Sequence, residues 1–219
     1  MKLKRNPLLL MLIVLLIGGE AFGQTDPAAK SILDKVGNTY SSYKTIVADF
    51  TLNGHNSVEK SDFNEKGRVY LAPGTGNYKI ETPQHALISD GKTQWTVLLD
   101  IGEVQVTDVN PNDKSLSPTN IFFFYRKGYS MKKLKDAVAG GQALYAIELK
   151  PDDNTQNISR IVLRVNKSSS MIYDASVFDK NGNTYTYTLK NIETNKTFSP
   201  GIFQFYKHNY PGVEIVDLR

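Results

Sequence analysis

After residue 45 the sequence is dominated by short segments in which side chains of different polarity alternate. In the first of them Ile46, Ala48, Phe50 and Leu52 occupy every second position. A period of two places alternate side chains on opposite faces of a strand, so these segments are predicted to be β-strands. Further strands are predicted at residues 66–72, 76–82, 85–89, 93–99, 102–108, 142–150, 158–165, 171–178 and 184–193.

Turn-forming residues separate several of the predicted strands. They include Pro73-Gly74, Asp90-Gly91, the run from Pro151 to Asn154, and Asn181-Gly182. Many consecutive strands joined by hairpins predict an up-and-down antiparallel sheet that is long enough to curl into a barrel. No internal repeat or linker divides the chain, so we expect one domain.

The tripeptide Gly91-Lys92-Thr93 matches the end of a phosphate-binding loop. That loop needs another glycine five residues earlier, where this chain has Ala86, and it leads into a helix. The residues after Thr93 are instead β-branched, aromatic and leucine, as is typical of a strand. We therefore interpret the stretch as a type I′ hairpin turn with positive φ at Asp90 and Gly91.

Two segments have helical features. Asp26 is a predicted cap and Pro27 the first helical position, and the helix is expected to end near Ser41. Its apolar stripe is predicted to be Ala28, Ile32, Val36 and Tyr40, with Leu33 beside it. A second helix, 118–127, is apolar on all sides, so it must be buried on both sides or face something apolar. Its apolar residues are Ile121, Phe122, Phe123, Phe124 and Tyr125.

The N-terminus is predicted to be a cleaved secretory signal, residues 1–23, followed by a single mature domain, residues 24–219. Basic residues precede an apolar run from Leu8 to Ile17, which is shorter than the ~17 residues of a membrane span. Small residues at Ala21 and Gly23 suit signal peptidase. A retained membrane anchor is the alternative. The chain has no cysteine, which excludes a lipid anchor, disulfides and thiolate metal sites.

Neither charge nor motifs indicate nucleic-acid binding or catalysis. The signal holds three basic residues and one acidic residue, so its net charge of +2 accounts for half of the chain's +4. The three histidines have no ligand spacing, Asp152-Asp153-Asn154 lacks the rest of a calcium loop, and alternation gives no reason to pair Asp49 with Glu81. We therefore predict no enzyme activity, no cofactor and no metal.

Aromatic residues are abundant instead, with ten Phe, twelve Tyr and one Trp. Tyr185 and Tyr187 share one face of a predicted strand with Leu189. A curled sheet with an apolar concave face and an apolar helix beside it predicts a hydrophobic cavity. Alternation does not distinguish a filled interior from a hollow one.

Four strings carry a family resemblance: "DKVGNTYSSYKTIVADFT", "ISDGKTQWTVLLD", "DKNGNTYTYTLKN" and the final "YPGVEIVDLR". In this order they resemble the bacterial outer-membrane lipoprotein carrier family, LolA. The resemblance implies an incomplete antiparallel β-barrel with helices as a lid over a hydrophobic cavity. It also implies a monomeric periplasmic carrier that takes acylated lipoproteins from an inner-membrane ABC-type release complex to an outer-membrane acceptor.

Alternation and the resemblance together select candidate site residues. The lipid-binding cavity is predicted to be lined by Phe50, Leu52, Val69, Leu71, Tyr78, Ile80, Trp95, Val97 and Leu99. A one-residue slip in register would move such a set to the other face. The predicted lid is Ile121, Phe122, Phe123, Phe124 and Tyr125. Family members often have an arginine before a proline where this chain has Ala72, and either Arg68 replaces it or Arg68 faces solvent.

Two further functions are compatible with these features. One is an envelope-stress sensor or adaptor domain of similar shape that binds a protein partner. The other is a cavity that holds a different lipid, with or without hydrolysing it. A carrier needs no polar catalytic group inside its cavity, which favours carriage over hydrolysis.

Overall fold

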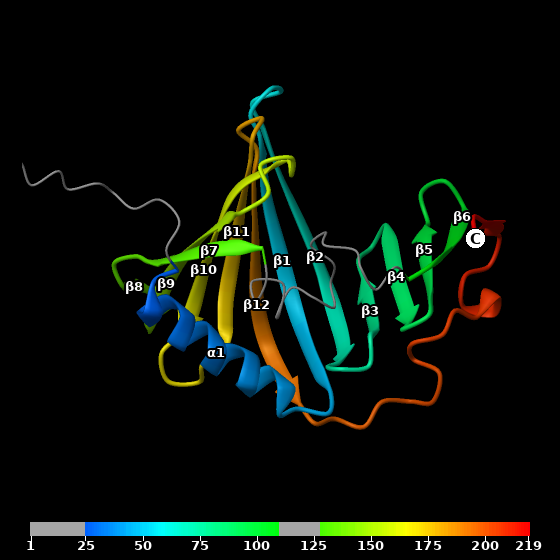
Figure 1. The fold of residues 1–219 in the computed structure, drawn as a ribbon. Coiled ribbons are helices and arrows are strands. Elements are labelled where there is room, and N and C mark those ends of the chain that lie inside the picture. The colour runs from blue at the N-terminus through cyan, green and yellow to red at the C-terminus, as the bar shows by residue number, and fades with distance from the viewer. Residues whose placement is uncertain (1–24, 110–127) are drawn as a thin grey trace, which may run out of the picture.

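The structure, a computed structural model, describes residues 25–109 and 128–219 (Figure 1). The predicted signal and the predicted helix 118–127 with its five lid residues lie outside these ranges. The described part contains the helix α1 (Pro27–Ser41), a 3-10 turn η2 (Lys207–Asn209) and a sheet of 13 strands. None of its helices is long and apolar enough to cross a membrane.

The strands closely follow the predicted segments. They are β1 Ile46–Asn56, β2 Ser61–Ala72, β3 Asn77–Glu81, β4 His85–Asp90, β5 Thr93–Leu98, β6 Glu103–Asp108, β7 Tyr129–Lys133, β8 Ala137–Ala139, β9 Gln142–Pro151, β10 Ile158–Asn166, β11 Ile172–Asp179, β12 Thr184–Thr194 and β13 Glu214–Asp217. Sequence reasoning missed β7, β8 and β13, which are short.

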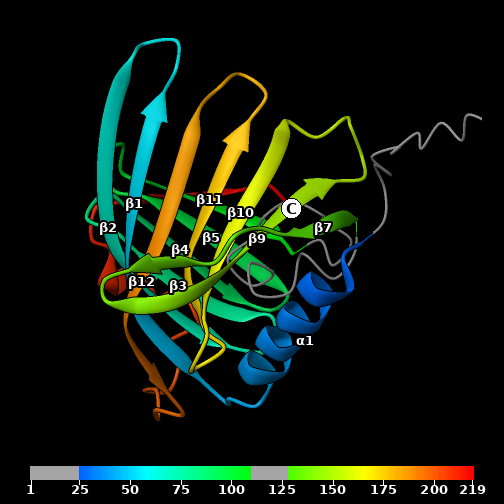
Figure 2. The same cartoon turned by 90° about the vertical axis from the view of Figure 1, so that its left-hand side faces the viewer.

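One sheet contains all of these strands, in the order β13-β6-β5-β4-β3-β2-β1-β12-β11-β10-β9-β7, with β8 beside β9. Neighbours pair antiparallel, except that β13 pairs parallel with β6. The described sheet curves strongly but stays open, because β13 and β7 stand at its two ends (Figures 1 and 2). The antiparallel curled sheet is thus confirmed, while a helical lid is not.

Helix α1 begins where the sequence predicts. One oxygen of the Asp26 carboxylate accepts a hydrogen bond from the Ala28 backbone N–H at 2.8 Å, as a helix cap does. The other oxygen accepts from the Lys133 backbone N–H at 3.0 Å, which ties the helix to β7. These hydrogen bonds, above all that from Lys133, hold the pKa of Asp26 below its ordinary value.

The buried stripe of α1 contains the predicted Leu33, Val36 and Tyr40 but differs from the prediction in its first two turns. Ala29, Leu33, Val36 and Tyr40 are buried, whereas Ala28 is exposed and Ile32 half-buried. The four buried side chains repeat at i, i+4, i+7 and i+11, which keeps them on one side of the helix. They form a core with residues of β1, β2, β3, β7, β9, β10 and β11.

The side of the sheet on which α1 lies is called the inner face, and the opposite side the outer face. Between β1 and β6 the strands pair without any register shift. Directly paired residues of antiparallel strands project from the same face. Because Ile46, Leu71 and Tyr78 are paired in turn and belong to the core with α1, their rows define the inner face.

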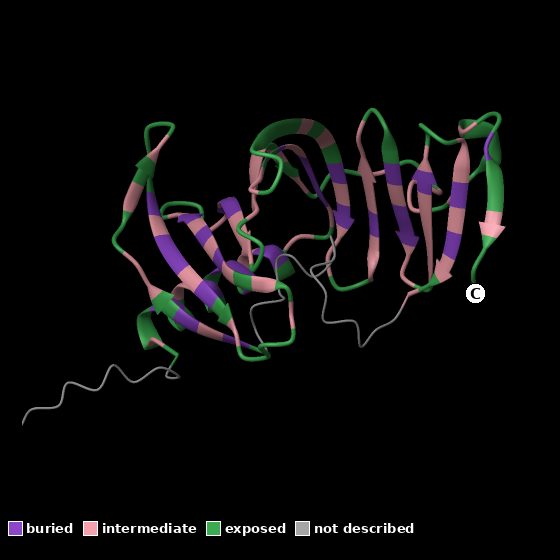
Figure 3. Cartoon of the chain, turned by 90° about the horizontal axis from the view of Figure 1, so that it is seen from above, coloured by how far each residue is buried: buried purple, intermediate pink, exposed green. Residues whose placement is uncertain are grey.

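A second, smaller core lies on the outer face. Ala86, Val97 and Val104 pack there with Val213, which comes from the C-terminal segment. Three half-buried aromatic rings extend this core: the Trp95 and Phe205 centroids are 6.5 Å apart, and those of Phe205 and Tyr210 are 5.6 Å apart. Buried positions therefore alternate along the strands near the C-terminus as well as near α1 (Figure 3).

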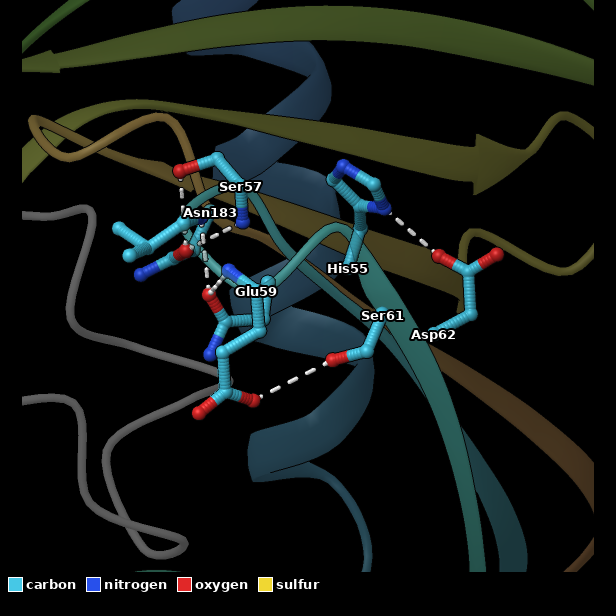
Figure 4. Close-up of polar contacts among 8 residues, drawn as sticks. His55, Ser57, Glu59, Ser61, Asp62 and Asn183 are labelled. Carbon is cyan, nitrogen blue, oxygen red and sulfur yellow. Dashed lines mark hydrogen bonds and ion pairs between the residues drawn. The ribbon is translucent and has the colours of Figure 1, made fainter.

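The hairpin of β1 and β2 is longer than predicted. The half of the hairpin that is nearest its turn is polar, and side-chain contacts across the two strands stabilise it. Asn64 donates a hydrogen bond to Asn53 at 2.6 Å, and His55 lies 2.6 Å from Asp62. At its tip the Ser57 backbone N–H donates to the Asn183 side chain at 2.9 Å, which joins the β11–β12 turn (Figure 4). Because both faces of this part are solvated, its sequence lacks the alternation of apolar and polar residues from which a strand is predicted.

The turn after β4 is a hairpin, as predicted, but not of type I′. Gly91 has φ of 87°, whereas Asp90 does not have positive φ. The Asp90 carboxylate instead accepts hydrogen bonds from the backbone N–H groups of Lys92 at 2.9 Å and Thr93 at 2.8 Å. An aspartate side chain that bonds its own backbone in this way makes a second positive φ unnecessary.

The hydrogen bond between α1 and β11 gives a test of the inner core. The buried Tyr40 hydroxyl accepts from the Ile172 backbone N–H at 3.1 Å. Tyr40→Phe leaves that N–H without its partner, so we expect a loss of about 1–3 kcal/mol in unfolding free energy. Tyr43→Phe, at a half-buried position whose hydroxyl has no described partner, should change stability by less than about 0.5 kcal/mol. Equal effects of the two changes in urea denaturation would contradict this assignment.

Candidate functional site

The candidate site is a set of apolar side chains on the inner face of β1, β2, β3 and β12. Pairing places Phe50 opposite Leu189, Leu52 opposite Tyr187, and Gly54 opposite Tyr185. We call the following residues the apolar surface: Phe50, Leu52, Phe63, Ile80, Tyr185, Tyr187 and Leu189. Leu52 is 9% exposed and Phe63 44%, and the other five are half-buried.

Two glycines leave room for aromatic rings on this surface. Phe50 is paired with Gly67, and Phe63 with Gly54. A Cβ atom at Gly67 would lie 2.6 Å from the Phe50 ring, and one at Gly54 would lie 2.0 Å from the Phe63 ring. Both glycines therefore provide space for a neighbouring ring, which covers the strand in place of the missing side chain.

The structure places six of the nine predicted cavity residues on the inner face. Val69, Leu71 and Tyr78 are buried in the core with α1, and are 7%, 3% and 3% exposed. Burial raises the pKa of Tyr78 to about 12, and its neutral hydroxyl donates to Gln94. Phe50, Leu52 and Ile80 belong to the apolar surface. A ligand could therefore reach Phe50 and Ile80 more readily than the three core residues.

The other three predicted cavity residues do not lie on the inner face. Trp95 and Val97 project from the outer face, in the same rows as their β4 partners Ile88 and Ala86, and both belong to the C-terminal core. Leu99 follows β5 in a turn and is 43% exposed. The common-face prediction was wrong here, because the inner row continues from Tyr78 through Ser89 to Gln94.

Sequence reasoning left two groups of the apolar surface out of the predicted cavity. The sequence predicts that Tyr185, Tyr187 and Leu189 share a face, and their pairing with β1 shows that it is the inner face. Phe63 was missed because it lies in a polar stretch that resembles a loop. Its ring is 6.2 Å from that of Tyr185, centroid to centroid. The signal available for Phe63 was its position opposite Gly54 in the hairpin.

The apolar character of the inner face ends at β5. There and in β6 the inner row positions are polar except for Leu98: Gln94, Thr96, Glu103, Gln105 and Thr107. Gln105 donates a hydrogen bond to Glu103 at 2.8 Å. The inner face thus has an apolar part near β1 and β12 and a polar, hydrogen-bonding part near β6.

An open pocket of about 590 Å³ lies where β2 continues beyond the end of β3. Its charged side chains project from the outer face. Arg68 Nε is 2.8 Å from Asp49 Oδ1, and Asn191 donates to the other oxygen of Asp49 at 2.8 Å. These two hydrogen bonds, with Asn191 the larger influence, keep the pKa of Asp49 below its ordinary value. Arg68 is thus half-exposed and faces away from α1.

The chain is similar to known proteins in sequence and, separately, in fold. The family model described as "Outer membrane lipoprotein carrier protein LolA" matches residues 41–206. The comparison with curated proteins finds no match. The matched range contains β1 to β12 and therefore the entire apolar surface.

Three solved structures are reported for comparison of the fold. An uncharacterized conserved protein from Thermus thermophilus has a TM-score of 0.60 at 13% identity, covering 87% of this chain and 99% of that one. A LolA superfamily protein from Nitrosomonas europaea has a TM-score of 0.43 at 12% identity, covering 81% and 97%. A chain of the Pseudomonas aeruginosa MucA/MucB complex has a TM-score of 0.45 at 10% identity, covering 82% and 62%. Of these three, the Thermus protein shows the shared fold.

The placement of Trp95 can be tested against that of Ile80. Trp95→Ala removes packing with Phe205 on the outer face, so we expect a loss of about 2–4 kcal/mol in unfolding free energy. Binding of the apolar dye 1-N-phenylnaphthylamine by the folded variant should not change. Ile80→Ala, on the inner face, should weaken dye binding. If Trp95→Ala weakened dye binding as much as Ile80→Ala, Trp95 would belong to the ligand surface after all.

Proposed function

Because this chain belongs to the LolA family, we propose that it is a carrier that shields the acyl chains of lipoproteins against its inner face. The observation that carries this proposal is the apolar surface, where half-buried aromatic and aliphatic side chains from four strands gather on one side of a curved sheet. Such convergence of apolar side chains on a concave face is typical of sites for apolar ligands.

The energetics of acyl chains explain why a carrier would need this surface. Each methylene group exposed to water costs about 0.8 kcal/mol. Two or three acyl chains together therefore cost on the order of tens of kcal/mol outside a membrane. A protein that moves a lipoprotein through water therefore has to replace most of the contact between the acyl chains and the membrane interior with contact to its own apolar side chains.

The proposed direction and partners of transport are those that the family resemblance implies. The carrier would receive acylated lipoproteins from an inner-membrane ABC-type release complex, cross the periplasm as a monomer, and deliver them to an outer-membrane acceptor. Binding and release suffice for this function, so we propose no catalytic step. An adaptor that binds a protein partner instead would leave the apolar surface without an acyl ligand.

The proposed location gives a simple test. We expect the chain to be exported by residues 1–23 and to begin at Gln24 after cleavage. Mass spectrometry of the protein from a periplasmic fraction should identify an N-terminal peptide that starts at Gln24. An N-terminal peptide that still contains Met1 would contradict export by a cleaved signal.

The role of the apolar surface can be tested at Phe63, which is 44% exposed and costs little stability to replace. Phe63→Ser removes an aromatic contact with the acyl chain, so we expect affinity for a fluorescent fatty acyl probe to fall about fivefold. Ile101→Ser is the matched control, because Ile101 is 64% exposed in the turn between β5 and β6. Unchanged binding by Phe63→Ser, or an equal loss in both variants, would count against the inner face as the binding surface.

A further inference from the structure

The two faces of the central strands differ in charge. In β1 to β6 and in β12, pairing places the strand lysines and arginines on the outer face: Lys66, Arg68, Lys79 and Lys190. Arg68 and Lys79 there pair with the carboxylates of Asp49 and Glu81, at 2.8 and 2.6 Å. The inner positions of the same strands contain no lysine or arginine.

A carboxylate does lie on the inner face, within the apolar surface. Glu65 is paired with Leu52, and Leu52 with Tyr187, so the three side chains stand in one row. The Glu65 side chain is 28% exposed. The pKa of Tyr187 is raised, mainly by burial and in addition by the charge of Glu65, which agrees with their proximity.

The Glu65 carboxylate receives no hydrogen bond from any described residue. His85, on the same face, is its ion-pair partner, but His85 Nδ1 is 3.9 Å from Glu65 Oε1 and thus beyond hydrogen-bonding distance. A half-buried carboxylate surrounded by apolar side chains normally has a donor. This side chain is therefore an acceptor that a ligand can use.

Building on the proposed carrier function, we propose that Glu65 selects the polar end of the acylated ligand. The preferred head group is a hydrogen-bond donor, either an amide N–H or an ammonium, next to the acyl chains. A head group with a carboxylate or phosphate is disfavoured, because it meets the Glu65 carboxylate on a face where β1 to β6 and β12 place no lysine or arginine. Acylated polypeptides belong to the first class, and fatty acids and anionic phospholipids to the second.

Competition among three ligands with the same chain length tests this selectivity. Dodecylamine, dodecanamide and dodecanoate would each displace 1-N-phenylnaphthylamine from the protein at neutral pH and low salt. We expect dodecylamine and dodecanamide to displace the dye at concentrations about fivefold lower than dodecanoate, as one exposed charge contact allows. Glu65→Gln should remove the preference for the amine over dodecanoate.

The control is Glu81→Gln, on the outer face, which should keep the wild-type preference. Circular dichroism establishes that each variant is folded, and Glu65→Asp, which keeps the charge, should retain the preference if Glu65→Gln does not fold. Equal displacement by all three ligands, or an unchanged preference in Glu65→Gln, would overturn the role of Glu65 but not the carrier function. If neither the dye nor any of the ligands bound, the carrier function itself would fail.

Discussion

The uninterrupted pairing register from β1 to β6 is the constraint on which the rest of the structure depends. Side chains alternate between the two faces along each strand. One set of directly paired residues therefore fixes the face from which every side chain of the neighbouring strands projects. Phe50 opposite Gly67 and Leu52 opposite Glu65 are consequences of this register. A shift by one residue would move Lys66 and Arg68 into the apolar surface.

The same register explains why the sheet has two cores on opposite faces. Near α1 the apolar side chains of β1, β2 and β3 project from the inner face. In β5 and β6 the apolar side chains of Val97 and Val104 project from the outer face, where another segment has to cover them. The C-terminal segment supplies that cover with Phe205, Tyr210 and Val213, and β13 adds to the edge at β6. The inner face beyond β4 is consequently polar, which limits how far an apolar ligand surface can extend.

Much of the fold could be predicted from the sequence, because turn residues and alternation mark the strands directly. The helix cap at Asp26 and the shared face of Tyr185, Tyr187 and Leu189 were also visible there. The face of each strand relative to the others was not, because alternation repeats within a strand and says nothing about its neighbours. That is why Trp95 and Val97 were assigned to the wrong face. Phe63 was missed because its significance depends on Gly54 across the hairpin.

The central claim is that the inner face carries acyl chains, and the most direct measurement is native mass spectrometry of the protein recovered from its own periplasm. We expect a population whose mass exceeds that of the free chain by the mass of an acylated polypeptide, which is released when detergent is added. Protein that was consistently free of acylated ligand, or that carried a non-acylated protein partner instead, would contradict it.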